Sequence, residues 1–424
     1  MAETIFALSS GSPPAAIAVI RISGPQAGTA LLALAGRTPP AREARVATLR
    51  TASGDMLDRA LVLWLPGPNS ATGEDTAELH LHGGRAVVAA VERALAAVPG
   101  LRPAVPGEFT RRAFLNGRID LVEAEGLADL LAAETELQRQ SAIAAADGRF
   151  SGTVAEWRDR VLLLSAQLEA QLDFSDDDDV RPLDESFMWN VAALSREMAE
   201  HLARPRAELL RDGYRVVLAG PPNAGKSTLF NALVEAQAAI TSPQAGTTRD
   251  VLSRPVSLDG VPFLFLDTAG LREDAADPVE RIGVERAQSE LGRADLILWL
   301  GPPGEAPLAA WLIAPKADLD GEPEGSARHH VSARTGAGLD ALKQDLVTHA
   351  RAALPRPGEA ALNRRQSDLV SEAHDALGNL ASITDPLIAA EHLRLARVAF
   401  DRLLGGATTE DMLDALFGRF CIGK

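Results

Sequence analysis

The hydrophobic pattern of the first part of the chain alternates short apolar runs with Gly and Pro. Arg85–Val98 has helical spacing and is followed by Pro99-Gly100, a pair that ends helices. Runs with the length and composition of β-strands are Ala16–Ile22, Ala60–Leu65 and Ala77–Leu81. This mixture predicts an α+β domain over residues 1–117.

The pattern becomes helical from Ile119 to about Arg211, where Gly and Pro are scarce. The apolar residues within Leu121–Leu131 fall on one stripe of a helix, and those of Val161–Leu172 fall on another. Asp176–Asp179 interrupts this region, and four like charges in a row indicate a solvated loop in preference to a metal site. We therefore expect long helices in residues 118–212.

Strand and helix patterns alternate from Tyr214 to about Ala353, as in a parallel α/β domain. Pro355–Gly358 is a linker, after which the helical pattern returns and continues to Phe417. We predict a multidomain chain of α/β and all-α parts. An α/β domain, residues 213–353, is inserted into a helical domain made of residues 118–212 and 354–424.

The composition supports a folded, multidomain protein. The chain has 424 residues, of which 46% are hydrophobic and 24% charged, so it does not resemble a disordered protein. The single Cys excludes a disulfide within the chain and fits a reducing compartment. The N-terminus lacks a basic signal region and no apolar run reaches 18 residues, so we expect a cytoplasmic protein without membrane contact. The net charge of −16 argues against sequence-independent nucleic-acid binding.

The strongest chemical signal is a phosphate-binding loop. The strand pattern Arg215–Ala219 leads into Gly220–Ser227, which reads G-x-x-x-x-G-K-S, and a helical pattern follows. The main-chain N–H groups of such a loop surround a phosphate, its Lys bridges the β- and γ-phosphates, and its Ser hydroxyl binds Mg²⁺. The nucleotide-binding residues predicted here are Asn223, Ala224, Gly225, Lys226, Ser227 and Thr228.

Later motifs follow in the order that a GTPase uses. Thr248 is placed to complete the Mg²⁺ shell, Asp267 to hold Mg²⁺ through water, and the Gly270 N–H to contact the γ-phosphate. Asp318 can accept two hydrogen bonds from guanine that adenine cannot supply. The further nucleotide-binding residues predicted from these motifs are Thr268, Ala269, Lys316, Ser332, Ala333 and Arg334.

Several positions depart from the common GTPase pattern. Leu271 stands where many GTPases have a Gln that orients water; Glu280 could do this instead, although its spacing alone favours a solvated helix start. Pro315 replaces the Asn that would contact guanine and the phosphate loop. The segment between Leu300 and Pro315 is also too short for the usual helix and loops, so we expect a shortened G domain.

Motifs along nearly the whole chain resemble the MnmE family of tRNA-modifying GTPases, also called TrmE. The most specific is the ending, Phe420–Lys424. The other motifs that carry the resemblance are Arg21–Gly24, Pro66–Ser70, Thr72–Asp75, His82–Gly84, Pro106–Thr110, Arg112–Gly117 and Asp267–Arg272.

This resemblance implies a folate-binding N-terminal domain, a discontinuous helical domain and an inserted Ras-like G domain. It implies a homodimer formed through the N-terminal domains, and a heterotetramer with the flavoprotein MnmG (GidA). Together they would add an aminomethyl-type group to C5 of the wobble uridine, U34, of tRNA. The one-carbon unit would come from 5,10-methylene- or 5-formyl-tetrahydrofolate, and K⁺ and Mg²⁺ would assist GTP hydrolysis.

The resemblance also implies roles for individual residues. Lys226, Glu280 and Cys421 would be catalytic, although Glu280 follows a segment from Gly270 to Val279 that is one residue longer than is common. Ser227 and Thr248 would bind Mg²⁺. The implied K⁺ ligands are Asn223, Ser242, Gln244 and Thr247, of which Ser242 and Thr247 also count among the GTP-binding residues. The implied folate contacts are Arg21, Glu78, Arg118 and Lys424.

The residues alone leave alternatives open for the N-terminal and C-terminal candidates. Arg21 ends an apolar strand and is either an anion ligand or a surface arginine, and Glu78, in an alternating strand, is typical of an exposed edge residue. Arg118 stands where the family commonly has Lys, which keeps the charge and changes its geometry. Cys421 would be reactive beside Lys424 and arginines, or else an inert terminal thiol.

Two other function classes fit parts of the pattern. An Era-like switch in RNA or ribosome assembly would share the G domain but lack residues 1–118 and the Cys-Ile-Gly-Lys ending. A P-loop ATPase would share the phosphate loop, with Asp318 incidental. Competition between ATP and GTP for binding separates this last class from a GTPase.

Overall fold

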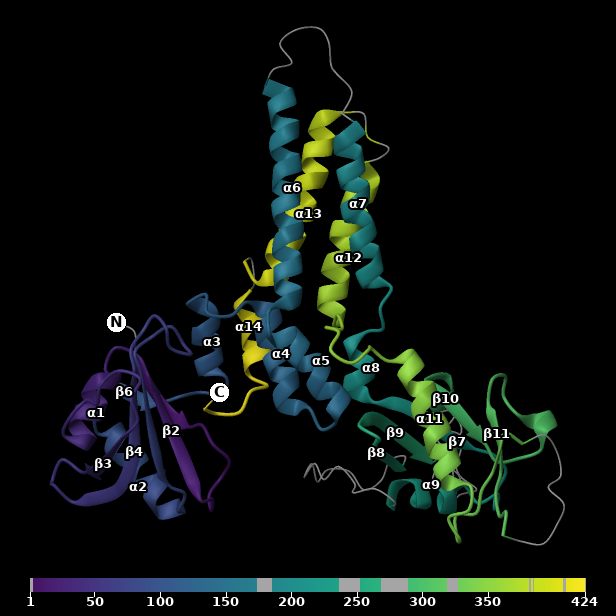
Figure 1. Ribbon diagram of the computed structural model, residues 1–424, viewed down its shortest axis with the longest axis horizontal. Coiled ribbons are helices and arrows are strands. Elements are labelled where there is room, and N and C mark those ends of the chain that lie inside the picture. The colour runs from purple at the N-terminus through teal and green to yellow at the C-terminus, as the bar shows by residue number, and fades with distance from the viewer. Residues whose placement is uncertain are drawn as a thin grey trace, which may run out of the picture. The chain divides into compact units, whose positions relative to one another are not determined.

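The computed structural model describes residues 3–173, 185–235, 252–267, 289–318, 327–380, 383, 385–406 and 409–423. The chain divides into two compact units, each described by itself (Figure 1). One unit is residues 1–128 with 401–424, and the other is residues 129–400. The domain boundaries predicted at 117, 212 and 353 stay predictions.

A mixed sheet forms the centre of the first unit, with strand order β3-β4-β5-β2-β1-β6. Its neighbours pair antiparallel except β1 and β6, which are parallel. The strands are β1 Thr4–Leu8, β2 Ile17–Ser23, β3 Arg45–Arg50, β4 Met56–Leu65, β5 Thr76–His82 and β6 Leu101–Pro103. The runs expected as strands from their composition correspond to β2, β4 and β5, so these predictions are confirmed.

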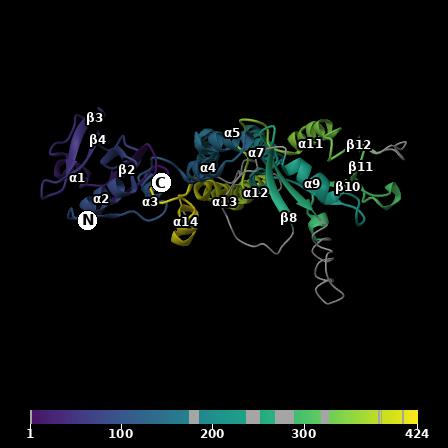
Figure 2. The ribbon, with the colours of Figure 1, turned by 90° about the horizontal axis from the view of Figure 1, so that it is seen from below.

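Helices cover this sheet because alternate strand residues are apolar on the covered face. Helices α1, Ala27–Ala35, and α2, Arg85–Ala96, lie near the strands of this sheet (Figure 2). They bury Leu31 and Val91 in one core with strand residues such as Ile20. The helix expected at Arg85–Val98 is therefore confirmed. A separate buried cluster joins Phe109 of α3, Glu108–Leu115, to Ile5, Ala7 and Ala104.

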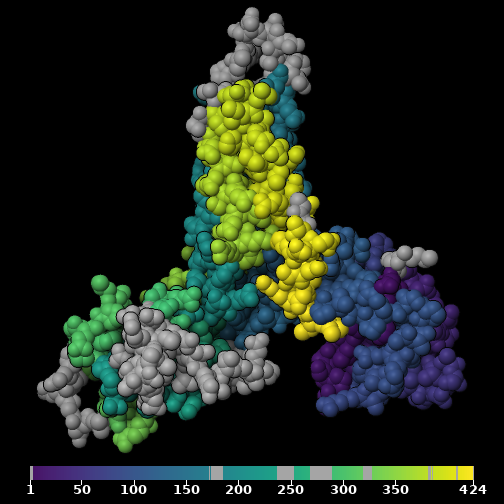
Figure 3. All heavy atoms as spheres, turned by 180° about the vertical axis from the view of Figure 1, so that it is seen from behind, coloured from purple at the N-terminus to yellow at the C-terminus, as the bar shows by residue number. Residues whose placement is uncertain are grey.

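The C-terminal segment belongs to the first unit. Helix α14, Glu410–Phe417, and Phe420 share a core with Leu121 at the start of α4, Leu121–Ala132. Figure 3 shows these C-terminal residues, in yellow, against blue residues of the N-terminal part. Gly107 has φ +68°, and a Cβ there would lie 2.2 Å from the Phe417 carbonyl oxygen. Only glycine combines this backbone conformation with so close an approach.

Long helices form one part of the second unit, as the helical spacing predicts. They are α5 Glu136–Ala146, α6 Arg149–Asp173, α7 Glu185–Leu202, α8 Ala207–Asp212, α12 Arg364–Asn379 and α13 Pro386–Leu404. Trp157 of α6 is fully buried, and its ring lies 5.1 Å from that of His201 and 6.1 Å from that of Phe400. Within the described residues, no helix is long and apolar enough to cross a membrane.

The other part of the second unit is an α/β domain with strand order β12-β11-β10-β7-β9-β8. The pairs are parallel apart from the antiparallel hairpin β8–β9. Its elements are β7 Tyr214–Ala219, α9 Lys226–Glu235, β8 Leu252–Leu258, β9 Val261–Asp267, β10 Leu296–Trp299, β11 Trp311–Ala314, β12 His329–His330 and α11 Leu339–Ala353. The central strands β7, β9 and β10 are mostly apolar, which is typical of a sheet whose faces are covered by helices.

The link between β10 and β11 is shortened, as its length in the sequence predicts. It contains the 3₁₀ helix η2, Pro303–Glu305, and then enters β11 at Trp311 without an α-helix in this fully described stretch. The α/β domain therefore has a short connection, with one 3₁₀ helix, before the edge strands β11 and β12.

The turn between β8 and β9 joins this α/β domain to helix α5. Asp259 and Gly260 both have positive φ, 48° and 75°, which suits the tight two-residue turn. The Leu137 N–H donates to the Gly260 carbonyl at 3.0 Å, and Leu137 is buried in the core of the α/β domain. Arg351 donates to the Asp259 carboxylate at 2.7 Å. The start of α5 is thus anchored in the α/β core.

Candidate functional site

The phosphate loop lies at the carboxyl end of β7, where an open α/β sheet binds its ligands. Gly220 has φ +145°, and a Cβ there would lie 2.8 Å from the carbonyl oxygen of Leu300, just after β10. The loop therefore packs directly on main chain from the neighbouring strand. Asn223, with φ +62°, and Gly225, with φ +90°, also have positive φ, so the backbone changes direction at both residues before α9 begins.

Lys226 closes this loop on itself. It is the first residue of α9 and is 7% exposed. Its Nζ donates to the carbonyl oxygens of Gly220, at 3.0 Å, and Pro221, at 2.8 Å. The ammonium group thus lies across the loop beside the N-terminus of α9, where an anion would gain both the lysine charge and the helix N–H groups.

The other predicted loop residues are accessible to a ligand. Asn223, Ser227 and Thr228 are exposed, and Ala224 and Gly225 are half-buried. Ser227 and Thr228 follow Lys226 in the first turn of α9. The structure therefore places the lysine and the two hydroxyl residues at the start of α9, directly after the predicted loop.

Asp267 lies on the strand next to the loop. It is the last residue of β9, is fully buried, and pairs in register with Leu218 of β7. Asp267 is therefore at the end of the strand that pairs with β7, and β7 leads into the phosphate loop. The other predicted residues of the phosphate side lie outside the described residues: Ser242, Gln244, Thr247, Thr248, Thr268, Ala269, Gly270 and Glu280.

The predicted base-binding residues form a second loop pair. Asp318 accepts from the Ser332 hydroxyl at 2.6 Å and from Arg334 Nε at 2.9 Å. The Ser332 hydroxyl, followed by Arg334, holds the pKa of Asp318 below its usual value, so the carboxylate is charged near neutral pH. Ala333 is half-buried between these residues, and Lys316 is exposed with φ +63°.

Pro315 brings the base-binding loop beside the phosphate loop. A Cβ built on Gly225 would lie 3.7 Å from the Pro315 Cβ, an ordinary van der Waals distance. The residue that replaces the expected Asn therefore stands beside Gly225, and its ring has no amide group to offer the phosphate loop. The two loops, predicted separately from the sequence, lie next to each other.

In the first unit, the predicted folate residues Arg21 and Glu78 pair with each other across neighbouring strands. They are register partners on β2 and β5, with Arg21 Nε 3.1 Å from Glu78 Oε1. The guanidinium also lies over the ring of Phe109, 5.9 Å from its centre, and His80 contacts the other Glu78 oxygen at 3.2 Å. Both side chains are mostly buried. The interpretation of Glu78 as an exposed edge residue is wrong, because β5 lies between β4 and β2.

The C-terminal tail packs on β1, the strand next to β2. A Cβ on Gly423 would lie 2.0 Å from the Leu8 carbonyl oxygen, and the neighbouring Ala7 is the register partner of Arg21. Cys421 is exposed, and Lys424 lies outside the described residues. Arg118 is exposed and borders the loop at Gly73, far along the sequence from the tail.

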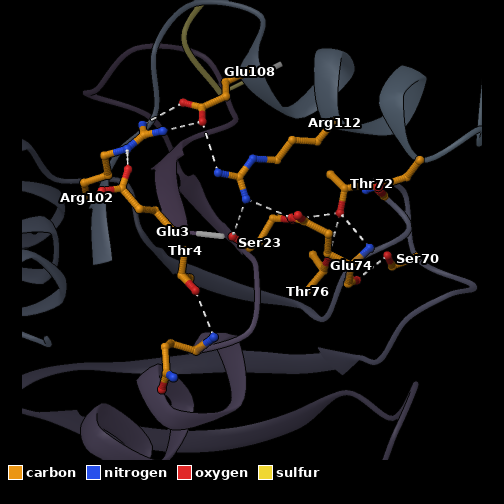
Figure 4. A network of polar contacts seen from close by, with 12 residues as sticks. Glu3, Thr4, Ser23, Ser70, Thr72, Glu74, Thr76, Arg102, Glu108 and Arg112 are labelled. Atoms are coloured by element: carbon orange, nitrogen blue, oxygen red, sulfur yellow. Dashed lines mark hydrogen bonds and ion pairs between the residues drawn. The ribbon is translucent and has the colours of Figure 1, made fainter. Parts of the chain in front are cut away.

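A buried polar network in the first unit was not predicted from the sequence (Figure 4). Glu108 of α3 accepts from Arg102, at 2.6 and 2.8 Å, and from Arg112 at 3.1 Å. Arg112 continues to Glu74 at 2.9 Å, and the Ser23 hydroxyl donates to Glu74 at 2.8 Å. Apart from Arg102, these residues belong to the motifs that carry the family resemblance, and the charged residues of those motifs were the available signal.

The network keeps its carboxylate charged. Burial alone would raise the pKa of Glu108, but hydrogen bonds from Arg102, the Val105 N–H and Arg112 outweigh it and lower the pKa below the usual 4.5. Because Ser23 ends β2, Arg102 lies in β6 and Glu74 lies in the loop before β5, the network ties α3 to the sheet that carries Arg21 and Glu78.

The α/β domain, with its phosphate loop, buried Asp267 and adjacent Asp318 loop, has the features of a P-loop GTPase. Comparison with known families identifies the chain more closely. Residues 121–421 match the MnmE helical domain family, and residues 4–118 match the family described as GTP-binding protein TrmE N-terminus. The chain belongs to the MnmE family of tRNA modification GTPases.

Full-length relatives support this assignment. A protein of Erythrobacter litoralis, "tRNA modification GTPase MnmE", is 63% identical over 423 residues and covers 100% of both chains. Proteins with the same description from Novosphingobium aromaticivorans and Zymomonas mobilis are 60% and 50% identical, again over 100% of both chains. The family predicted from the motifs is therefore confirmed.

Among solved structures, the G domain of the T. maritima FeoB iron transporter is similar at 26% identity. The match covers 32% of this chain and 98% of that chain, with a TM-score of 0.24. A score this low supports no conclusion, and the fold of the α/β domain rests on its strand order and phosphate loop.

Replacing Glu108 tests the polar network through its pH dependence. The lowered pKa of Glu108 means that its stabilisation is complete above the usual pKa and is lost as the pH falls below it. Glu108→Gln should lower the free energy of unfolding at pH 7 by about 1–3 kcal/mol. It should also reduce the loss of stability between pH 6 and pH 3. Pulse proteolysis in urea, read at peptides of α3, measures both.

Glu43→Gln is the matched control, because Glu43 pairs with Arg45 on the exposed surface of the same unit. It should leave stability nearly unchanged at every pH. Equal pH profiles for Glu108→Gln and the unaltered chain would contradict the role assigned to the network.

Proposed function

We propose that this member of the MnmE family hydrolyses GTP through the α/β domain while acting in tRNA modification. The observation that carries the nucleotide assignment is Asp318, held by Ser332 beside the phosphate loop. A carboxylate there selects guanine, whose ring N–H and amino groups are both donors. The names of the full-length relatives support the link to tRNA.

The phosphate side gives each residue of this chain a defined task. Lys226 would leave the carbonyl oxygens of Gly220 and Pro221 to bind the β- and γ-phosphates. Ser227, Thr248 and Asp267 offer hydroxyl and carboxylate oxygens, the donor type that Mg²⁺ prefers. When bound, Mg²⁺ neutralises charge that develops on the phosphates. Asn223 to Thr228 would enclose the phosphates, and Thr268 to Gly270 would contact the γ-phosphate.

The K⁺ proposal rests on the family resemblance and on the exposure of Asn223 in the phosphate loop. Asn223 is exposed beside the loop, and with Ser242, Gln244 and Thr247 it would form a set of oxygen ligands. K⁺ held there supplies positive charge of the kind that an arginine finger provides. Glu280 would orient the water that attacks the γ-phosphate.

For the first unit we propose a tetrahydrofolate site and the dimer contact. Arg21 and Glu78 form a polar pair beside the end of the C-terminal tail, which supports folate contacts from Arg21, Glu78, Arg118 and Lys424. The exposed Cys421 would take part in transfer of the one-carbon unit from 5,10-methylene- or 5-formyl-tetrahydrofolate. The chain would act in the cytoplasm as a homodimer and assemble with MnmG on tRNA.

Lys226→Ala tests the nucleotide assignment. Loss of the ammonium group removes a charge that contacts the transferred phosphate, so GTP hydrolysis should fall by at least about 10²-fold. Phosphate release from GTP measures the rate. Lys343→Ala in α11 is the control and should hydrolyse GTP normally. Undiminished hydrolysis by Lys226→Ala would rule out the phosphate loop as the active site.

Exchanging KCl for NaCl tests the cation proposal. If K⁺ takes the place of an arginine finger, hydrolysis should slow by at least about tenfold in Na⁺. The GDP dissociation constant, measured in both salts, shows whether the loss lies in hydrolysis and not in binding. Equal turnover in the two salts would remove K⁺ from the mechanism.

Cys421→Ser separates the two activities. Because Cys421 lies in the first unit, the variant should hydrolyse GTP at the normal rate and fail to restore modified wobble uridine in a strain that lacks the protein. Mass analysis of tRNA nucleosides measures the modification. Arg419→Ser, also exposed in the tail, should restore it. Full restoration by Cys421→Ser would exclude a chemical role for this thiol.

A further inference from the structure

The carboxylate of Asp318 has protein donors on both of its oxygens. Ser332 Oγ lies 2.6 Å from Oδ1, and the Arg334 guanidinium approaches Oδ2 with Nε at 2.9 Å and Nη2 at 2.6 Å. The side chain of Asp318 is 13% exposed. One carboxylate oxygen therefore faces a serine hydroxyl and the other faces a guanidinium, and a bound guanine would need to donate to both oxygens.

The Ser332 contact is a fixed part of the fold. Ser332 is fully buried, and its Oγ accepts from the Thr335 N–H at 3.2 Å. The hydroxyl proton is thereby left to donate to Asp318. Since a carboxylate oxygen can accept more than one hydrogen bond, Oδ1 remains usable by a ligand while Ser332 holds it.

The Arg334 contact is of another kind, because the arginine side chain is 76% exposed. It reaches Oδ2 from solvent, and an ion pair this exposed is weak and easily broken. A guanidinium presents two neighbouring N–H donors, Nε and Nη, in a fixed plane. Guanine presents a similar pair, its ring N–H and its amino group.

We propose that Arg334 competes with guanine for Asp318, so that it limits the affinity of the chain for guanine nucleotides. Oδ2 already faces both Nε and Nη2 of the guanidinium, so it has no acceptor position left for a donor of guanine. A guanine nucleotide must displace the guanidinium to gain its second hydrogen bond, and release of the nucleotide restores the ion pair. Arg334 thus favours nucleotide exchange in a chain that already lacks the Asn at Pro315.

This inference rests on the proposed function, since it assumes that guanine binds at Asp318. An arginine in a base-binding loop could instead stack on the bound guanine. If Arg334 stacked on the bound base, its removal would weaken binding. If it competes for Oδ2, its removal strengthens binding. The two roles therefore predict opposite signs.

Arg334→Met tests the competition in the full-length chain, because Met keeps an unbranched side chain and removes every donor. Dissociation constants for GDP and for inosine diphosphate, which lacks the amino group, are measured by fluorescence competition against a ribose-labelled GDP. Loss of an exposed ion pair corresponds to a change of about two- to fivefold. We expect Arg334→Met to bind GDP about threefold more tightly and inosine diphosphate nearly as before.

Arg364→Met is the matched control, since Arg364 is exposed and faces Asp368 in helix α12. It should bind both nucleotides like the unaltered chain. Unchanged or weaker GDP binding by Arg334→Met would overturn the inference, and so would equal tightening of both nucleotides. An unaltered chain that binds no GDP would instead overturn the proposed function.

Discussion

The close approach of the phosphate loop to the main chain after β10 determines where the nucleotide site can form. Gly220 meets Leu300 at a distance that leaves no room for a side chain, so the loop is seated on the parallel sheet. From this seat the loop turns through Asn223 and Gly225 into α9, and Lys226 is drawn over it by two carbonyl oxygens. The base-binding loop reaches the same place through Pro315.

Arginine–carboxylate pairs organise the candidate sites of both units, but they differ in burial. In the first unit, Arg112 and Glu108 are largely hidden from water, and their contacts hold loops in place. At Asp318 the arginine is exposed, so its ion pair contributes little stability and can be exchanged for a ligand. The same pair of chemical groups can therefore serve as a structural contact or as a replaceable one.

The turn at Asp259-Gly260 connects the α/β domain to helix α5. It joins β8 to β9, and β9 ends at Asp267 beside the phosphate loop. The same turn contacts Leu137, which is buried in the α/β core while belonging to α5. The hairpin of β8 and β9 is therefore joined to α5 by a main-chain hydrogen bond and by apolar packing.

The sequence by itself determined the family and the fold class, and it predicted the residues of the phosphate loop. These follow from contiguous patterns, because a strand–loop–helix motif needs only neighbouring residues to define its geometry. Tertiary structure decided the pairing of Arg21 with Glu78, the seating of Gly423 on β1, and the grouping of Ser23, Glu74, Glu108 and Arg112. It also decided that Arg334 meets Asp318. Such contacts join residues distant in sequence, and they depend on strand register and side-chain packing, which no local pattern encodes.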